Sequence, residues 1–262
     1  MSDIHIYEQP LSERFRLFLR AEQLFERLDH HLLGDSPWDT HAALQSLLEL
    51  MQPLSRGDSK RELIKEIDRQ RAALSDIDSR AAPERVRIDQ ALRNHESVLD
   101  ALYKRPGALG TELKDNELLG NLQQRASAGG RPGILDLPSY QEWLQRPAAE
   151  RHDTIRSWLE PVDAARTGIE QCLQLVRSSA AWATVEARDG FYEQAFDAGT
   201  HVQLLRVRMS TDGASAGFHR FPELSAGRQR FSIRFFAQSS PAERARQIHE
   251  PVTFDMACCG AV

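Results

Sequence analysis

The sequence predicts an α+β fold: an N-terminal helical bundle containing an antiparallel coiled-coil-like helix pair, followed by a C-terminal antiparallel β-sheet domain. Two observations lead to this prediction. Through the first two-thirds of the 262 residues, apolar side chains recur every three or four positions, as on the buried face of a helix. From about residue 183 they alternate with polar side chains, as in strands with one buried face. We therefore expect a mainly helical domain at 1–182 and a β-domain at 183–262.

Two amphipathic segments open the helical part. Ser12 is a suitable N-cap for the first, and Arg16 and Arg20, one turn apart, lie beside its apolar stripe. That stripe consists of Phe15, Phe18, Leu19, Phe25, Leu28 and Leu32. The second segment, SPWDTHAALQSLLELMQPL, predicts a shorter helix that ends near Pro53.

The clearest periodicity lies in the next two segments, where seam residues are alternately four and three positions apart. The seam consists of Leu63, Ile67, Gln70, Leu74 and Ile77, and then of Ile88, Leu92, His95, Leu99 and Leu102. A turn at SRAAPE would fold the two helices antiparallel and set Gln70 opposite His95. We expect these two side chains to form a hydrogen-bonded structural layer that fixes the register, in preference to a ligand role for His95.

Glycine and proline then interrupt the helical pattern. The segments KRPGALG and ASAGGRPGILDLP flank a short helix at 112–125, and we expect an irregular segment at about 126–138. A long helix follows over 148–180, which Pro161 either kinks or divides by starting a new first turn.

The β-domain contains three alternating stretches, VQLLRVRMS, RQRFSIRFF and VTFDMACC. We expect one antiparallel sheet whose apolar face packs against the helices, and the N-terminal stretch 4–8 could add a strand. The opposite face would carry Arg206, Arg208, Arg230 and Arg234. Such a face is usually solvated, but strands that use arginine and no lysine also suit the recognition of carboxylates or phosphates.

The adjacent cysteines near the C-terminus raise the question of a metal or redox site. The chain has only three cysteines, and Cys258 and Cys259 are expected on opposite faces of a strand, so both thiols rarely reach one ion. His219 and His249 could add nitrogen ligands, but the end of a terminal strand in a reducing compartment is the better interpretation. We expect no metal and no cofactor.

Catalytic motifs are almost absent from the sequence. GASAG places Ser215 in the G-x-S-x-G pattern of hydrolases, but no helical period follows it, and few later partners remain, of which Glu243 and His249 are possible. There is no P-loop, no H-E-x-x-H and no G-x-G-x-x-G. We therefore expect a protein that is not an enzyme.

Bulk properties favour a cytoplasmic protein. The formal net charge of −5 weighs against non-specific nucleic-acid binding. The opening MSDIHIYEQP lacks the basic and apolar regions of a secretory signal. No stretch approaches the roughly 18 consecutive apolar residues of a membrane-spanning helix.

Several stretches together resemble the bacterial Z-ring-associated protein D (ZapD) family. In order along the chain they are YEQPLSERFRLFLRAEQL, RGDSKRELIKEIDRQ, LDLPSYQEWL, GFY, RFSIRFF and FDMACC. The resemblance implies a cytoplasmic homodimer with a helical and a β-domain. It also implies that the homodimer binds the C-terminal tail of FtsZ and cross-links FtsZ filaments at the midcell division ring, without enzymatic activity or a cofactor. A terminal ACC then looks like a family ending rather than a redox motif.

The resemblance also suggests binding residues. Arg16, Arg230 and Arg234 match family positions implicated in FtsZ recognition, and we infer the same role for Arg20 and Arg56, which fall in matching motifs. The alternative is a nucleic-acid-binding module that uses the same arginine face. The acidic net charge, the few exposed aromatics expected among these arginines and the lack of an RNP-like motif weigh against it.

Overall fold

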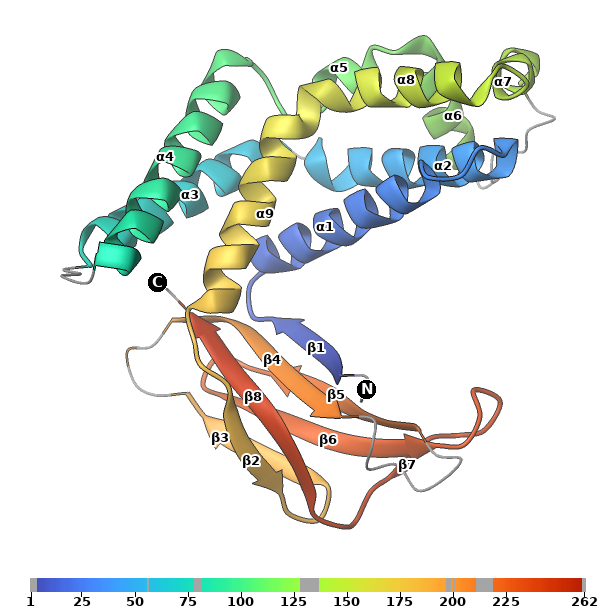
Figure 1. The fold of residues 1–262 in the computed structure, drawn as a ribbon. Helices are drawn as coiled ribbons and strands as arrows, with labels where there is room; N and C mark the ends of the chain where they lie inside the picture. The colour runs from blue at the N-terminus through green and yellow to red at the C-terminus, as the bar shows by residue number, and fades with distance from the viewer. Residues whose placement is uncertain are drawn as a thin grey trace. The chain divides into compact units, whose positions relative to one another are not determined.

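The computed structural model describes residues 4–55, 57–77, 82–127, 137–196, 199, 201–210 and 219–260. It has the predicted α+β fold, with a helical N-terminal part and antiparallel sheets (Figure 1). The chain divides into two compact units. The helical unit is Leu17–Cys172, and the β unit combines Met1–Arg16 with Leu173–Val262.

Sequence signals explain most helix boundaries. The helices are α1 (Glu13–His31), α2 (Pro37–Leu54), α3 (Ser59–Ser75), α4 (Ala82–Lys104), α5 (Thr111–Lys114), α6 (Glu117–Ser127), α7 (Pro138–Leu144), α8 (Ala148–Leu159) and α9 (Asp163–Ser178). The Ser12 hydroxyl accepts a hydrogen bond from the Phe15 amide at 3.2 Å, which confirms Ser12 as the cap of α1. Helix α2 begins with a capping box between Ser36 and Asp39 and ends at Leu54, beside Pro53 as predicted.

Two expected helices are each divided. The predicted helix 112–125 is broken between α5 and α6, because the Asn116 side chain accepts the Leu119 amide at 3.1 Å and starts a new helix. The predicted helix 148–180 contains a short 3-10 turn at Glu160–Val162, with Pro161 at its first turn, between α8 and α9. The irregular segment expected at 126–138 lies mostly outside the described residues.

The predicted helix pair exists, and a third helix covers it. Helices α3 and α4 lie side by side (Figure 1). Most seam residues are buried, whereas Ile77 and Leu92 are only partly buried. A Cβ atom on Gly168 of α9 would lie 3.0 Å from a methyl group of Val98 and 3.3 Å from one of Ile67. Helix α9 therefore packs closely on the seam, and only a small residue fits at Gly168.

The hydrogen bond expected between Gln70 and His95 is not formed. Both side chains are buried as expected, but the Gln70 amide nitrogen donates to Glu66 at 3.1 Å and to the Cys172 carbonyl of α9 at 3.2 Å. Both ring nitrogens of His95 are buried without a partner among the described residues. The prediction was wrong because the two-helix seam did not include α9, which offers a backbone acceptor to Gln70.

The β unit contains two antiparallel sheets. Their strands are β1 (Ile4–Pro10), β2 (Ala183–Ala187), β3 (Phe191–Ala195), β4 (Val202–Ser210), β5 (His219–Ala226), β6 (Arg230–Gln238), β7 (Arg246–Gln247) and β8 (Val252–Gly260). Sheet A has the order β1-β4-β8-β2. Sheet B has the order β3-β6-β5, and the short strand β7 also pairs with β6. The N-terminal stretch thus pairs with β4 in sheet A, from Ile4 opposite Ser210 to Pro10 opposite Leu204.

The two sheets pack face to face, so the expected single sheet against helices was wrong. Their shared core contains Leu205, Val207, Met209, Val252, Phe254 and Met256 from sheet A and Phe231, Ile233 and Phe235 from sheet B. The rings of Phe235 and Phe254 join the layers, with centroids 4.9 Å apart. Figure 1 shows β4 and β8 in one layer and β5 and β6 in the other. Alternation predicts that one face is buried, but it does not say what covers that face.

A tight two-residue turn, closed by a bridge between Arg188 and Phe191, connects β2 of sheet A to β3 of sheet B. Asp189 and Gly190 both have positive φ, 54° and 63°, as the two central residues of a type I′ turn require. A Cβ atom on Gly190 would lie 1.9 Å from the Ile248 carbonyl oxygen. Glycine is therefore needed at position 190 for conformation and for space.

Candidate functional site

The four arginines expected on one face lie on two different sheets. Arg206 and Arg208 belong to β4 in sheet A, whereas Arg230 and Arg234 belong to β6 in sheet B. In each strand the arginines alternate with residues of the shared core, so their side chains are on the outer face of their own sheet. The predicted arginine surface is thus two separate surfaces.

On sheet A, the Arg206 side chain is largely covered by other parts of the chain and hydrogen-bonded to them. Its Nε atom donates to Glu8 of β1 at 2.8 Å, one Nη atom donates to the Arg177 carbonyl at 3.2 Å, and the side chain is only 13% exposed. Arg177 of α9 also donates to Glu8, at 2.7 Å. The Glu8 carboxylate therefore joins two cations from distant parts of the chain.

Arg208 has an equivalent internal partner. It donates to one oxygen of Asp255 on β8 at 2.7 Å, and Thr184 on β2 donates to the other oxygen at 2.6 Å. These hydrogen bonds, Thr184 first and then Arg208, lower the pKa of Asp255. Both Arg206 and Arg208 also lie over the Trp182 ring, at 4.9 and 4.7 Å from its centroid. Both arginines of this face are therefore paired with carboxylates of the same chain.

On sheet B the arginines are more available. The Arg230 side chain is 73% exposed and contacts Glu193 of β3 at 2.8 Å. Arg234 is exposed, and its guanidinium lies 5.7 Å from the centroid of the Phe191 ring. Among the residues that the structure describes, no carboxylate lies within ion-pair distance of Arg234. This arginine can therefore bind an external carboxylate without first losing an internal one.

Three phenylalanines share this outer face with the arginines. Phe191 lies directly opposite Arg234, and Phe221 lies directly opposite Phe236. The rings of Phe221 and Phe236 are stacked, with centroids 6.0 Å apart and planes at 19°. All three rings are partly exposed. The expectation of few aromatics beside the arginines was therefore wrong for sheet B.

A sequence signal for one of these rings was present. Phe235 and Phe236 are adjacent in RFSIRFF, and neighbouring residues of a strand point to opposite faces. Since Phe235 is in the core, Phe236 must point outward. Phe221 could not be placed in the same way, because sequence analysis did not recognise β5.

The other predicted binding residues lie elsewhere. Arg16 and Arg20 are both exposed on α1, and the 58% exposed Arg16 side chain lies 3.3 Å from Glu13. Arg56 lies outside the described residues. Of the five predicted residues, the structure thus brings Arg230 and Arg234 together on one sheet face.

The cysteines face opposite sides of β8, as predicted. Cys258 packs against the core between the sheets, whereas the buried Cys259 thiol lies 3.9 Å from the Arg177 carbonyl. Burial raises the pKa of Cys259, and none of the three cysteines is in a disulfide. Within the described ranges, no group of three or more His, Cys, Asp and Glu side chains is arranged to hold a metal ion. Ser215 lies outside the described residues.

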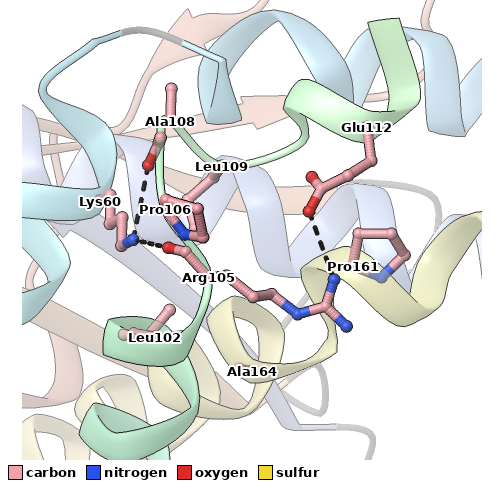
Figure 2. A pocket seen from close by; sticks show the side chains of 10 residues that line it. Lys60, Leu102, Arg105, Pro106, Ala108, Leu109, Glu112, Pro161 and Ala164 are labelled. Carbon is pink, nitrogen blue, oxygen red and sulfur yellow. Dashed lines mark hydrogen bonds and ion pairs between the residues drawn. The ribbon is translucent and has the colours of Figure 1, made fainter. Parts of the chain in front are cut away.

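A small open hollow in the helical unit is lined by residues from four segments (Figure 2). Its cations already have partners. The Lys60 ammonium donates to the Arg105 carbonyl and, at 3.4 Å, to the Gly107 carbonyl, and the Arg105 guanidinium lies 3.4 Å from Glu112. These bonds secure the chain after the C-terminus of α4, which is a structural role. In the part of the chain that the structure describes, no helix is both long and apolar enough to cross a membrane.

Comparison with known proteins agrees with the resemblance seen in the sequence. The model of the ZapD family, described as a cell division protein, matches residues 19–234. A "Cell division protein ZapD" of Azoarcus sp. (strain BH72) is 36% identical over 253 residues, which are 97% of this chain and 98% of that protein. Proteins of the same name from Methylococcus capsulatus and Cupriavidus pinatubonensis are 34% and 35% identical, again over 97% of this chain and 97% and 98% of theirs. This chain therefore belongs to the ZapD family of cell division proteins.

Proposed function

We propose that this chain is a non-enzymatic cell-division factor that acts as a homodimer. It binds the C-terminal tail of FtsZ and cross-links FtsZ filaments, which promotes assembly of the division ring at midcell in the cytoplasm. One structural observation supports this proposal most directly: Arg230 and Arg234 share an exposed sheet face, and Arg234 has no carboxylate partner among the described residues. The choice of FtsZ as partner rests on the family resemblance.

The chemistry of this face suits an acidic peptide. A guanidinium offers a planar fork of donors that can bind both oxygens of one carboxylate. Arg16 and Arg20 on α1, together with Arg56, are further candidates for contacts with the same tail. A contact of this kind is small and partly exposed, so it should be weak and sensitive to salt.

Dimerisation would convert a weak contact into a filament cross-link. A twofold homodimer carries two identical tail-binding sites. Filaments present many tails, and once one site is occupied the second binds at a high effective concentration. The proposed role needs neither a nucleophile nor a cofactor, because cross-linking depends on binding alone.

A single-stranded nucleic acid is the second candidate partner. The three phenylalanines on the outer face of sheet B favour it, because bases stack on exposed rings beside arginine. The net charge of −5 opposes it, since most nucleic-acid-binding surfaces belong to basic domains.

Co-sedimentation with polymerised FtsZ tests the proposal. The protein is mixed with full-length FtsZ and with FtsZ that lacks its C-terminal tail, and its mass in solution is measured by light scattering. We expect a dimer that bundles full-length FtsZ and does not pellet with the tail-less form. Equal bundling of both forms, or a monomer that bundles as well, contradicts the proposal.

A further inference from the structure

We propose that the outer face of sheet B recognises an apolar side chain as well as a carboxylate. Its ligand would be an extended acidic segment with a carboxylate and an apolar side chain two residues apart. This inference rests on the proposed function and adds the class of sequence that the tail must contain. We call the residues that form this surface the aromatic–arginine face: Phe191, Phe221, Arg230, Arg234 and Phe236.

On the aromatic–arginine face, Arg234 and the Phe221–Phe236 pair of rings lie at a defined spacing. Arg234 and Phe236 are two residues apart on β6, so both point outward and are separated by about 6.8 Å along the strand. Phe221 of β5 stacks on Phe236 and widens the apolar surface at that end. An extended peptide that runs along β6 repeats its side chains at the same interval. It can therefore place a carboxylate at Arg234 and an apolar side chain at the Phe221–Phe236 pair.

The conformation of Arg234 supports an external partner. Glu223 lies directly opposite Arg234 on β5, yet the guanidinium lies over Phe191 of β3 and forms no ion pair with Glu223. The contact with Phe191 positions the guanidinium, and no hydrogen bond occupies its N–H groups among the described residues. On sheet A, by contrast, the cation over an aromatic ring also binds an internal carboxylate.

The carboxylates of the same face favour a peptide over a nucleic acid. Glu193 contacts Arg230, and Glu223 is exposed opposite Arg234. Two acidic groups among two arginines would repel a continuous row of phosphates. A single carboxylate with an apolar neighbour needs only one available arginine and a patch of rings, which this face offers.

Fluorescence anisotropy with labelled peptides tests the inference on the full-length chain. One peptide contains Asp-Ser-Leu, and its matched control contains Asp-Ser-Ser at the same net charge. We expect the leucine peptide to bind about tenfold more tightly. Phe236→Thr, which keeps a strand-forming residue, should remove that difference without weakening the serine peptide. Arg234→Glu should weaken both peptides.

The outcomes separate this inference from the proposed function. If both peptides bind equally and Arg234→Glu weakens both, recognition of an apolar side chain is contradicted, while the proposed binding of the FtsZ tail is not. If neither the peptides nor FtsZ binds, both proposals fail. If labelled oligothymidylate binds the wild type and Phe236→Thr abolishes that binding, the rings stack on bases, and the inference that the ligand is a peptide is contradicted. Because the two peptides are compared on wild-type protein, the test does not depend on the variant folding.

Discussion

The outer faces of the two sheets have the same sequence pattern and different surroundings. In both β4 and β6, arginines alternate with core residues. On sheet A, Arg206 and Arg208 contact Glu8 and Asp255, which lie 198 and 47 residues away in the chain. On sheet B, Arg234 contacts an aromatic ring and no carboxylate among the described residues.

This difference separates arginines that stabilise the fold from arginines that are available for a partner. A guanidinium that is already bound to an internal carboxylate has fewer free N–H groups, and the charge of that carboxylate weakens its attraction for a second one. A guanidinium on a ring can bind an external carboxylate directly. Counting arginines on a predicted face therefore overestimates the binding surface.

Of the changes predicted here, removing the Glu8 carboxylate of sheet A should lower the stability most. Glu8→Ala leaves Arg206 and Arg177 without their shared partner in a partly buried site, and should lower the free energy of unfolding by about 3 kcal/mol. Glu193→Ala, the matched change on sheet B, should cost no more than about 0.5 kcal/mol because its partner Arg230 is exposed. Urea unfolding followed by circular dichroism measures both. Equal losses would remove the distinction between the two faces.

In the helical unit, His95 is a buried base whose ring nitrogens have no hydrogen-bond partner among the described residues. Burial first, and the charge of Arg71 second, lower the pKa of His95 from 6.5 to about 4 despite the opposing effect of Glu66. Between these values the unfolded chain binds the proton and the folded chain does not, so stability is full above pH 6.5 and falls as pH falls towards 4. The total loss should be about 3 kcal/mol.

The control for this pH dependence is His95→Leu. Its unfolding free energy should change less between pH 6.5 and 4 than that of the wild type, because an uncharged side chain cannot take up the proton. Urea unfolding at several pH values measures the difference. If both proteins respond equally to pH, His95 is not the group that titrates.

Charge reversal on sheet B should change binding and leave the fold intact. Arg234→Glu should weaken FtsZ binding by about 2 kcal/mol, more than tenfold, because repulsion replaces a charge-assisted hydrogen bond. Because Arg234→Glu would lie directly opposite Glu223, the free energy of unfolding should fall by up to about 1 kcal/mol, while the mass in solution stays unchanged. Arg156→Glu, at an exposed position of α8, is the charge-matched control. Co-sedimentation at low and moderate salt measures the effect. Bundling at the wild-type level by Arg234→Glu would place tail recognition elsewhere.

The smallest effect tests how far sheet A depends on one hydroxyl group. Thr184→Val removes the donor to Asp255 and should lower the unfolding free energy by about 1 kcal/mol near neutral pH. The pKa of Asp255 lies below its usual 3.8, so this stabilisation is present above pH 3.8 and is lost as pH falls below it. Thr253→Val, at an exposed position of β8, is the control. A difference from wild type that persists unchanged at low pH would argue against a bond to the ionised carboxylate.

Individual elements show how far sequence analysis could predict this structure. Most of the α1 stripe (Phe15, Phe18, Phe25 and Leu28) and the opposite orientations of Cys258 and Cys259 followed from spacing, and the end of α2 followed from Pro53. The break at Asn116 was missed because a single side-chain cap interrupts an otherwise helical pattern. Phe221 was missed because Pro222 and Glu223 obscure the alternation of β5. Arg230 and Arg234 were correctly placed on one face, but Arg206 and Arg208 were wrongly added to it.

By itself, the sequence determined most of the helical segments, the strands β1, β4, β6 and β8, and which of their side chains point towards a core, because these properties depend on periodicity along a few neighbouring residues. Only the tertiary structure decided which partner each polar side chain meets. Glu8 reaches Arg206 because β1 pairs with β4, and Gln70 bonds to α9 because a third helix covers the seam. Arg234 contacts no internal carboxylate among the described residues, because β3 places Phe191 beside it. Such contacts join residues far apart in the chain, and no local pattern records which distant segment will lie alongside.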